Sequence, residues 1–176
     1  MAKKNMRTEK DSMGDIEVPS EAYYGAQTQR AINNFKISNL QFSISFIKAL
    51  AIIKRSAAVV NSKLDKLDNN YSEAIIKACD EILEGKLNDQ FKVDIFQTGS
   101  GTSSNMNMNE VIANRASEIL GGKLGSRKPI HPNDHVNLGQ SSNDVIPSAI
   151  HISTYIDINN KLLPSLDSLE GALLNK

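Results

Sequence analysis

The chain is built around one polar stretch, which reads Gln97-Thr98-Gly99-Ser100-Gly101-Thr102-Ser103-Ser104-Asn105-Met106-Asn107-Met108-Asn109-Glu110. Almost nothing in this stretch is of a type that fills a core. Gly99 and Gly101 permit backbone conformations that turn successive N–H groups towards one anion, and Ser100 and Thr102 add hydroxyl donors. A helix that begins within or just after the stretch would add its free N–H groups and the positive end of its dipole. The stretch therefore predicts a site for a carboxylate or a phosphate.

Other uses of the same residue types have to be weighed against this one. Ser, Thr and Asn cap helices and Gly occupies turns, so a plain capped turn stays an open alternative. Nucleotide-binding loops are excluded, because the stretch has no Gly-Lys-Ser/Thr ending and lacks the third glycine of the dinucleotide fingerprint. A calcium loop is excluded as well, since residues 105–109 carry neither the acidic residues nor the central glycine that such a loop needs.

Four blocks of the sequence together resemble the class II fumarate hydratases. Residues 97–102, followed by residues 105–110, are similar to the first signature of that family. The other blocks are Thr8-Glu9-Lys10-Asp11-Ser12-Met13-Gly14, Gly25-Ala26-Gln27-Thr28-Gln29-Arg30, and the pair His131-Pro132-Asn133-Asp134-His135 and Gln140-Ser141-Ser142-Asn143-Asp144. The blocks follow the order of the family, and the resemblance covers essentially all 176 residues.

The resemblance implies a mainly α fold. Residues 1–139 would form the N-terminal helical domain of the fumarase/aspartase fold, and residues 140–176 would begin its central helical bundle. The implied activity is the reversible hydration of fumarate to (S)-malate, a tricarboxylic acid cycle reaction, with no metal and no other cofactor. Members of the family are homotetramers whose active sites draw on three subunits, so this chain would supply one wall of each dicarboxylate site.

The resemblance also assigns residues to two anion sites. Hydrogen bonds to the substrate carboxylates are expected from Ser100, Thr102, Ser141, Ser142 and Asn143. A second, peripheral anion site is expected at Lys128, His131, Asn133 and Asp134, where the family often has arginine at position 128. Neutral donors suit the substrate because they orient a dianion without neutralising the electrons that must flow into one carboxylate. Helix capping is the alternative role of residues 141–143, and the two roles are compatible.

The chemistry of the family needs more than this chain contains. Its mobile loop with a serine base, the lysine and asparagine of its third signature and the histidine of its proton relay all correspond to positions beyond Lys176. We therefore expect no catalytic residue within the chain and no activity of the chain alone. Gly139 also departs from the family, which commonly has serine there.

Two alternative functions remain open. Aspartate ammonia-lyase shares the scaffold, but that family tends to have alanine at the position of Ser100 and threonine at that of Ser142, which favours fumarase. A catalytically silent anion-binding or interaction domain is the alternative from another class. A stop codon directly after Lys176 would favour the silent domain, and a downstream third signature would favour the enzyme.

Composition narrows the choice of partner and compartment. Twenty basic and twenty acidic residues balance, so nothing argues for nucleic acid or a membrane surface as partner. The first fourteen residues do not resemble a signal peptide, and no segment holds about 18 consecutive apolar residues. The single Cys79 stands among apolar helical positions and fits a core filler in a reducing compartment. We therefore expect a soluble, cytoplasmic protein.

Periodicity predicts the elements that precede the central stretch. An extended segment is predicted at residues 15–18, followed by a helix that Ser20 caps and that runs to Asn33. Apolar residues at alternating spacings of four and three predict a helix from Ser43 to Leu64. Its basic residues fall off the apolar stripe, so we expect solvated side chains at Lys48, Lys54, Arg55 and Lys63. A further helix is predicted to be capped by Ser72 and to end at Gly85.

The elements after the stretch are predicted in the same way. A helix continues to residues 121–122, and residues 131–135 contain too much turn chemistry for a regular element. His131 and His135 could suggest zinc, but Pro132 argues against a ligand-bearing helix, so no metal is predicted. A domain boundary is placed near Gly139, and residues 143–144 are predicted to cap an unusually apolar helix that breaks at Pro164.

Overall fold

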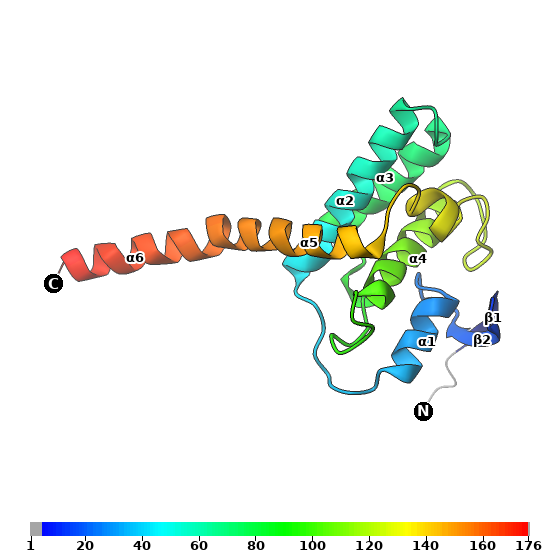
Figure 1. The fold of residues 1–176 in the computed structure, drawn as a ribbon, viewed down its shortest axis with the longest axis horizontal. Helices are drawn as coiled ribbons and strands as arrows, with labels where there is room; N and C mark the ends of the chain where they lie inside the picture. The colour runs from blue at the N-terminus through cyan, green and yellow to red at the C-terminus, as the bar shows by residue number, and fades with distance from the viewer. Residues whose placement is uncertain (1–4, 176) are drawn as a thin grey trace.

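The structure is a computed structural model that describes residues 5–175, and within them it is mainly helical, as predicted. A two-stranded hairpin, β1 (Met6–Asp11) and β2 (Gly14–Pro19), precedes the helices α1 (Ala26–Asn34), α2 (Ile44–Lys63) and α3 (Asn69–Leu83). A short turn η1 (Asn88–Gln90) leads to α4 (Thr102–Ile119), and η2 (Pro132–Val136) leads to α5 (Ser142–Asp157), η3 (Ile158–Leu162) and α6 (Leu163–Leu174). Figure 1 shows a body of packed helices from which α6 extends as a straight arm.

The hairpin explains why the first helix begins later than predicted. Strand β2 includes the predicted segment 15–18, whereas the antiparallel strand β1 was not predicted because its residues are almost all polar. The guanidinium of Arg7 on β1 donates to the carbonyls of Pro19, Ser20, Ala22 and Tyr24 at 2.8–3.0 Å. Those carbonyls are therefore unavailable to a helix. The prediction that Ser20 caps the helix is wrong, and α1 begins at Ala26.

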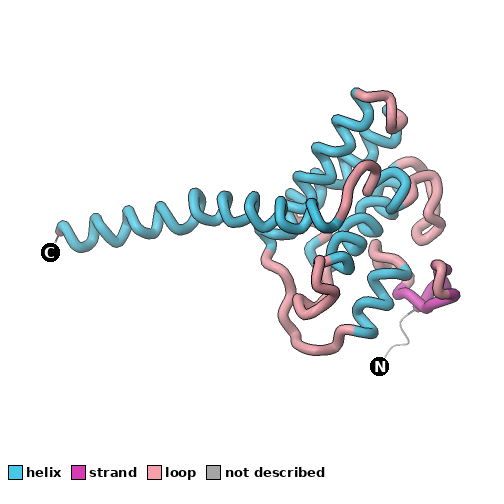
Figure 2. The backbone as a smooth tube through the Cα atoms, in the orientation of Figure 1, coloured by secondary structure: helices cyan, strands magenta, loops and turns pink. Residues whose placement is uncertain are grey.

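Helices α2 and α3 form an antiparallel pair in the body (Figure 2). The predicted cap of α2 is confirmed, since the hydroxyl of Ser43 accepts from the backbone N–H of Phe46 at 3.2 Å. The predicted cap of α3 is wrong, because Asp68 caps that helix and Ser72 lies inside it. The buried Ser72 hydroxyl instead donates to the carbonyl of Ala58 on α2 at 3.0 Å. Gly85, with φ +86°, follows the end of α3 as predicted.

Helix α4 is the centre of the body, and it contacts α1, α2, α3, α5 and η2. It begins within the polar stretch, at Thr102, and every residue from Ser104 to Asn114 is buried. The expectation that this stretch cannot fill a core is therefore wrong. Two of its buried amides bond to neighbouring segments: Asn107 donates to the carbonyl of Gln90 at 3.1 Å, and Asn114 donates to that of Tyr23 at 2.8 Å. The helix ends before Gly121, where φ is +79°, as predicted.

The last helix does not break at Pro164. The N–H of Leu163 donates to the carbonyl of Ile158, five residues back, so η3 is a π-helical turn. Pro164 then occupies the first turn of α6, where a missing backbone N–H costs little. Neither η3 nor α6 has a buried residue, and we call this pair of elements the arm (residues 158–174).

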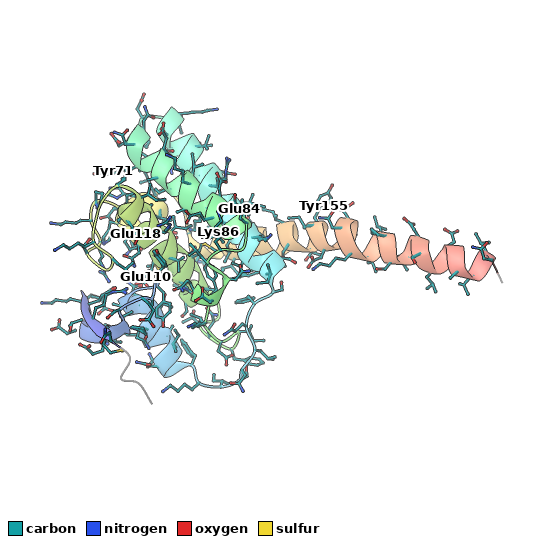
Figure 3. All side chains as sticks on the ribbon, turned by 180° about the vertical axis from the view of Figure 1, so that it is seen from behind. Tyr71, Glu84, Lys86, Glu110, Glu118 and Tyr155 are labelled. Carbon is teal, nitrogen blue, oxygen red and sulfur yellow. The ribbon has the colours of Figure 1, made fainter. Side chains whose placement is uncertain are left out.

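The arm exposes its apolar side chains. Exposed leucines along α6 include Leu163, Leu166, Leu169, Leu173 and Leu174. Tyr155, on α5 just before the arm, also faces solvent (Figure 3). Within the described part of the chain, no helix has the length and apolar character to span a bilayer. The domain boundary near Gly139 stays a prediction; Gly139 itself lies in a turn between η2 and α5.

Candidate anion site

The first functional residues lie in the loop that enters α4. Gln97 shapes this loop: its side-chain Nε2 donates to the carbonyl of Asp94 and to Ser104 Oγ, both at 2.8 Å, and its Oε1 accepts from the N–H of Ser104 at 2.9 Å. Gly101 precedes the helix with φ +64°, a conformation that favours glycine. Because the Ser104 N–H is already bonded within the loop, an anion here would depend mainly on the hydroxyl groups.

Three of the predicted substrate-binding hydroxyls meet at one point. Ser100 Oγ lies 2.8 Å from Thr102 Oγ1, and Thr102 Oγ1 lies 3.1 Å from Ser142 Oγ. Thr102 and Ser142 are 40 positions apart in sequence, and they meet because α4 and α5 begin side by side. A Cβ atom placed on Gly101 would lie 2.9 Å from the side chain of Ile146 on α5. The two helix N-termini thus present a row of neutral donors at the surface, the hydroxyl cluster (Ser100, Thr102, Ser142).

The remaining predicted donors stand at the first turn of α5. Ser141 caps the helix, since its Oγ accepts from the N–H of Asn143 at 3.3 Å, so the prediction that Asn143 and Asp144 form the cap is wrong. Asn143 is instead the second residue of the helix, directly after Ser142 of the hydroxyl cluster, and it is exposed. The capping alternative therefore holds for Ser141, whereas Asn143 is free to serve a ligand.

The four residues of the expected second anion site lie before and within η2. His131 Nδ1 accepts from the N–H of Asp134 at 3.3 Å and lies 3.1 Å from that residue's carboxylate. Asn133 and Lys128 are exposed. Residues 132–136 form a π-helical turn, so the prediction that they contain no regular element is wrong. The assignment of this group to an anion stays a prediction.

The two histidines of this segment are joined by a hydrogen bond. The N–H of His131 donates to His135 Nδ1 at 2.8 Å, and the His135 ring contacts Tyr71 on α3 with ring centroids 5.1 Å apart. Burial holds the pKa of His135 below its ordinary value. Among residues 5–175, no three His, Cys, Asp or Glu side chains gather as a metal site requires.

A buried polar cluster that the sequence analysis missed lies beneath the start of α5. Lys54, expected to be solvated, is fully buried on α2, and its Nζ donates to Asn137 Oδ1 and to Gln140 Oε1, both at 2.9 Å. Burial lowers the pKa of Lys54 to about 7. The periodicity of α2 gave no signal for this, because a lysine on the edge of an apolar stripe looks the same whether or not amides cover it.

A second missed residue is Glu110, which closes the polar stretch. Its buried carboxylate accepts from the backbone N–H groups of Gly25, Gln27 and Thr28 at 2.9–3.0 Å, and so it caps α1 from α4. Burial raises the pKa of Glu110. The block 25–30 therefore packs against the middle of the same helix that begins at the hydroxyl cluster, and Figure 3 shows Glu110 within the body.

Comparison with known proteins assigns the chain to a family. A family model described as "Lyase" matches residues 14–176. The chain is 54% identical over 170 residues to the class II fumarate hydratase of Halobacterium salinarum, covering 97% of this chain and 36% of that protein. It is 53% identical over 167 residues to the class II fumarate hydratase of Brucella suis, covering 95% of this chain and again 36% of the relative.

Solved structures give the same result. The recombinant class II fumarase from Schistosoma mansoni superposes with a TM-score of 0.90 and 47% identity, covering 93% of this chain and 34% of that one. A fumarate lyase:delta crystallin from Brucella melitensis superposes with a TM-score of 0.85 and 48% identity, covering 88% of this chain and 36% of that one. The chain thus spans about a third of the length of the proteins it matches.

Proposed function

Since this chain belongs to the lyase family, we propose that it supplies the carboxylate-binding wall of a class II fumarate hydratase, which interconverts fumarate and (S)-malate. The observation that carries the proposal is the meeting of Ser100, Thr102 and Ser142, with the exposed Asn143 directly after Ser142 on α5. The start of α4 and the start of α5 add two positive helix ends to the same point.

The arrangement suits a planar dianion. Hydroxyl and amide donors can hold and orient a carboxylate without cancelling its charge, and electrons must flow into one carboxylate when a proton leaves the neighbouring carbon. Among the described residues, no acid or base lies in hydrogen-bond contact with the hydroxyl cluster. The chain is therefore proposed to bind and orient substrate, while the proton-transfer groups come from elsewhere in the enzyme.

The proposal extends to assembly and to place of action. The exposed leucines of the arm fit a helix that packs into a bundle, in keeping with a homotetramer. A single buried cysteine and balanced charge fit a cytoplasmic enzyme with a small dicarboxylate partner. The second anion site at His131 belongs to this proposal as a peripheral site, outside the chemical step.

The test replaces Asn143 in a full-length enzyme that contains this chain. Loss of a hydrogen bond to a charged carboxylate is worth roughly 1.5–3 kcal/mol, so Asn143→Ala should lower kcat/KM for fumarate by about ten- to a hundredfold. Asn70→Ala is the matched control, because Asn70 is the exposed second residue of α3 as Asn143 is of α5. The kcat/KM of both variants is measured from the absorbance of fumarate at constant protein concentration.

Near-normal kcat/KM in a folded Asn143→Ala enzyme would remove Asn143 from the site. The same assay separates the alternative functions. Ammonia-dependent consumption of fumarate with no hydration would identify an aspartate ammonia-lyase, and absence of both reactions in the full-length protein would identify a silent binding domain. The 176-residue chain alone should show weak fumarate binding and no turnover.

A further inference from the structure

Lys54 is the largest side chain that is fully buried in the described part of the chain. Burying an ammonium group is costly unless hydrogen bonds compensate it, and no carboxylate is among the described partners of Lys54. Its partners are two amide oxygens, on Asn137 and Gln140. These two residues close the turn 137–140, which joins η2 to α5.

The turn is held from two helices at once. From α2, Lys54 binds its two amide oxygens, and Asn61, two helical turns further on, donates to the carbonyl of Leu138 at 3.0 Å. From α4, Asn105 and Asn109 each donate to Asn137 Oδ1 at 3.2 Å. Asn137 Oδ1 thus accepts three hydrogen bonds and links the turn to both helices.

The turn is also closed on itself. The N–H of Gln140 donates to the carbonyl of Asn137 at 3.1 Å, and Asn137 Nδ2 donates to the carbonyl of Gln140 at 3.0 Å. Gly139 takes φ +71°, which this tight geometry needs. A closed turn moves as one unit, so the bonds from Lys54 fix the direction in which the chain leaves it.

The chain leaves the turn directly into the anion site. Ser142 and Asn143 follow Gln140 by two and three residues, and Thr102 precedes Asn105 by three. The residues around Lys54 therefore lie two to three residues along the chain from Ser142 and Thr102 of the hydroxyl cluster. No hydrogen bond joins Lys54 to the hydroxyl cluster among the described residues, so any effect of Lys54 on a ligand is indirect.

We propose that Lys54 is a positioning residue for the dicarboxylate site: its two hydrogen bonds hold the turn 137–140 in the register in which Ser142 lies within hydrogen-bond distance of Thr102. The identity of the ligand rests on the function proposed above, whereas the dependence of the turn on Lys54 does not. A lysine with only a general stabilising role would affect the whole body, whereas a positioning lysine affects the turn and the start of α5 first.

The first experiment measures amide hydrogen exchange in the 176-residue chain carrying Lys54→Met. Exchange at Gln140 and Asn143 should become at least about tenfold faster, because their N–H bonds lie in the turn and the cap that it positions, while the amides of α3 keep the parental rates. Lys63→Met, at the exposed end of the same helix, is the matched control and should change neither segment.

Parental exchange rates at Gln140 and Asn143 in folded Lys54→Met would overturn the proposal, and so would an equal acceleration in α3. If Lys54→Met does not fold, Lys54→Gln is the variant to measure. Glutamine keeps a neutral NH2 donor group but is shorter, so it should still loosen the turn, and unchanged exchange in Lys54→Gln would overturn the proposal in the same way.

The second experiment measures kinetics in the full-length enzyme. Displacement of the donors at the start of α5 should weaken binding of the substrate and of the transition state equally. Lys54→Met should therefore raise KM for fumarate about tenfold or more and leave kcat within about threefold. A fall in kcat at unchanged KM would overturn a positioning role. If parental enzyme does not act on fumarate while the exchange result holds, the proposed function fails and the role of Lys54 in ordering the turn stands.

Discussion

Helix α4 and helix α6 relate sequence to burial in opposite ways. The first turns of α4 carry asparagines that lie in the centre of the body, whereas α6 carries leucines that lie in solvent. The asparagines can be buried because acceptors from neighbouring segments meet their amides: the carbonyls of Gln90 and Tyr23, and the side-chain oxygen of Asn137. The leucines are exposed because no other element of the described chain buries a residue of α6. Burial is thus decided by what surrounds a helix, and polarity alone does not predict it.

The largest effect should come from truncating matched apolar residues in the two helices. Ile112 on α4 is fully buried, so Ile112→Ala should lower the free energy of unfolding by about 2–5 kcal/mol. Leu169 on α6 is 56% exposed, and Leu169→Ala should change it by less than about 0.5 kcal/mol. Urea unfolding followed by circular dichroism measures both. Equal losses would show that the arm is already packed in solution.

The next effect concerns the polar side of α4. Glu110→Gln keeps the shape of the side chain but replaces one accepting oxygen with a donor that faces backbone N–H groups of α1. We expect a loss of about 1–3 kcal/mol in unfolding free energy. Glu73→Gln, at an exposed position on α3, is the control and should be neutral. An unchanged stability in Glu110→Gln would mean that the carboxylate is not what holds α1 on α4.

Lys54 makes the stability of the body depend on pH. Burial lowers the pKa of Lys54 to about 7, from an unfolded value of 10.5, so between these values the unfolded chain binds the extra proton. Unfolding free energy should therefore rise with pH above about 7, by at most about 1.4 kcal/mol per pH unit. The window for measurement ends near pH 8.5, where the thiol of the neighbouring Cys79, whose pKa burial raises, begins to ionise in the unfolded chain.

Chemical unfolding at half-unit pH steps from 6.5 to about 8.5 measures this dependence. Lys54→Met should remove the rise, because it removes the titrating group. A parental slope of zero over this range would mean that Lys54 keeps its proton in the folded protein.

The smallest effect on stability, and a clear effect on association, is expected in the arm. The exposed leucines should drive the 176-residue chain to self-associate as its concentration rises. Leu166→Glu with Leu169→Glu should keep the chain monomeric without changing its unfolding free energy. Light scattering over a concentration series measures the mass, and a parental chain that stays monomeric at every concentration would contradict the expectation.

Local signals in the sequence determined most of the elements. Ser43 caps α2 as predicted because this cap joins residues only three positions apart, and Gly85 follows the end of α3 for a similarly local reason. The polar stretch predicted a helix start with hydroxyl donors, and α4 begins within it. The family resemblance placed Ser100, Thr102 and Ser142 in one site before any geometry was known.

Tertiary structure decided whatever depends on a partner far away in sequence. Arg7 takes the carbonyls that a helix from Ser20 would have used, and Glu110 caps α1 from a distance of more than 80 residues. Lys54 is buried because two amides from the turn before α5 cover its ammonium group. A hydrogen bond is short-ranged in space but has no limit along the chain, so periodicity and propensity could identify these side chains and could not determine which groups satisfy them.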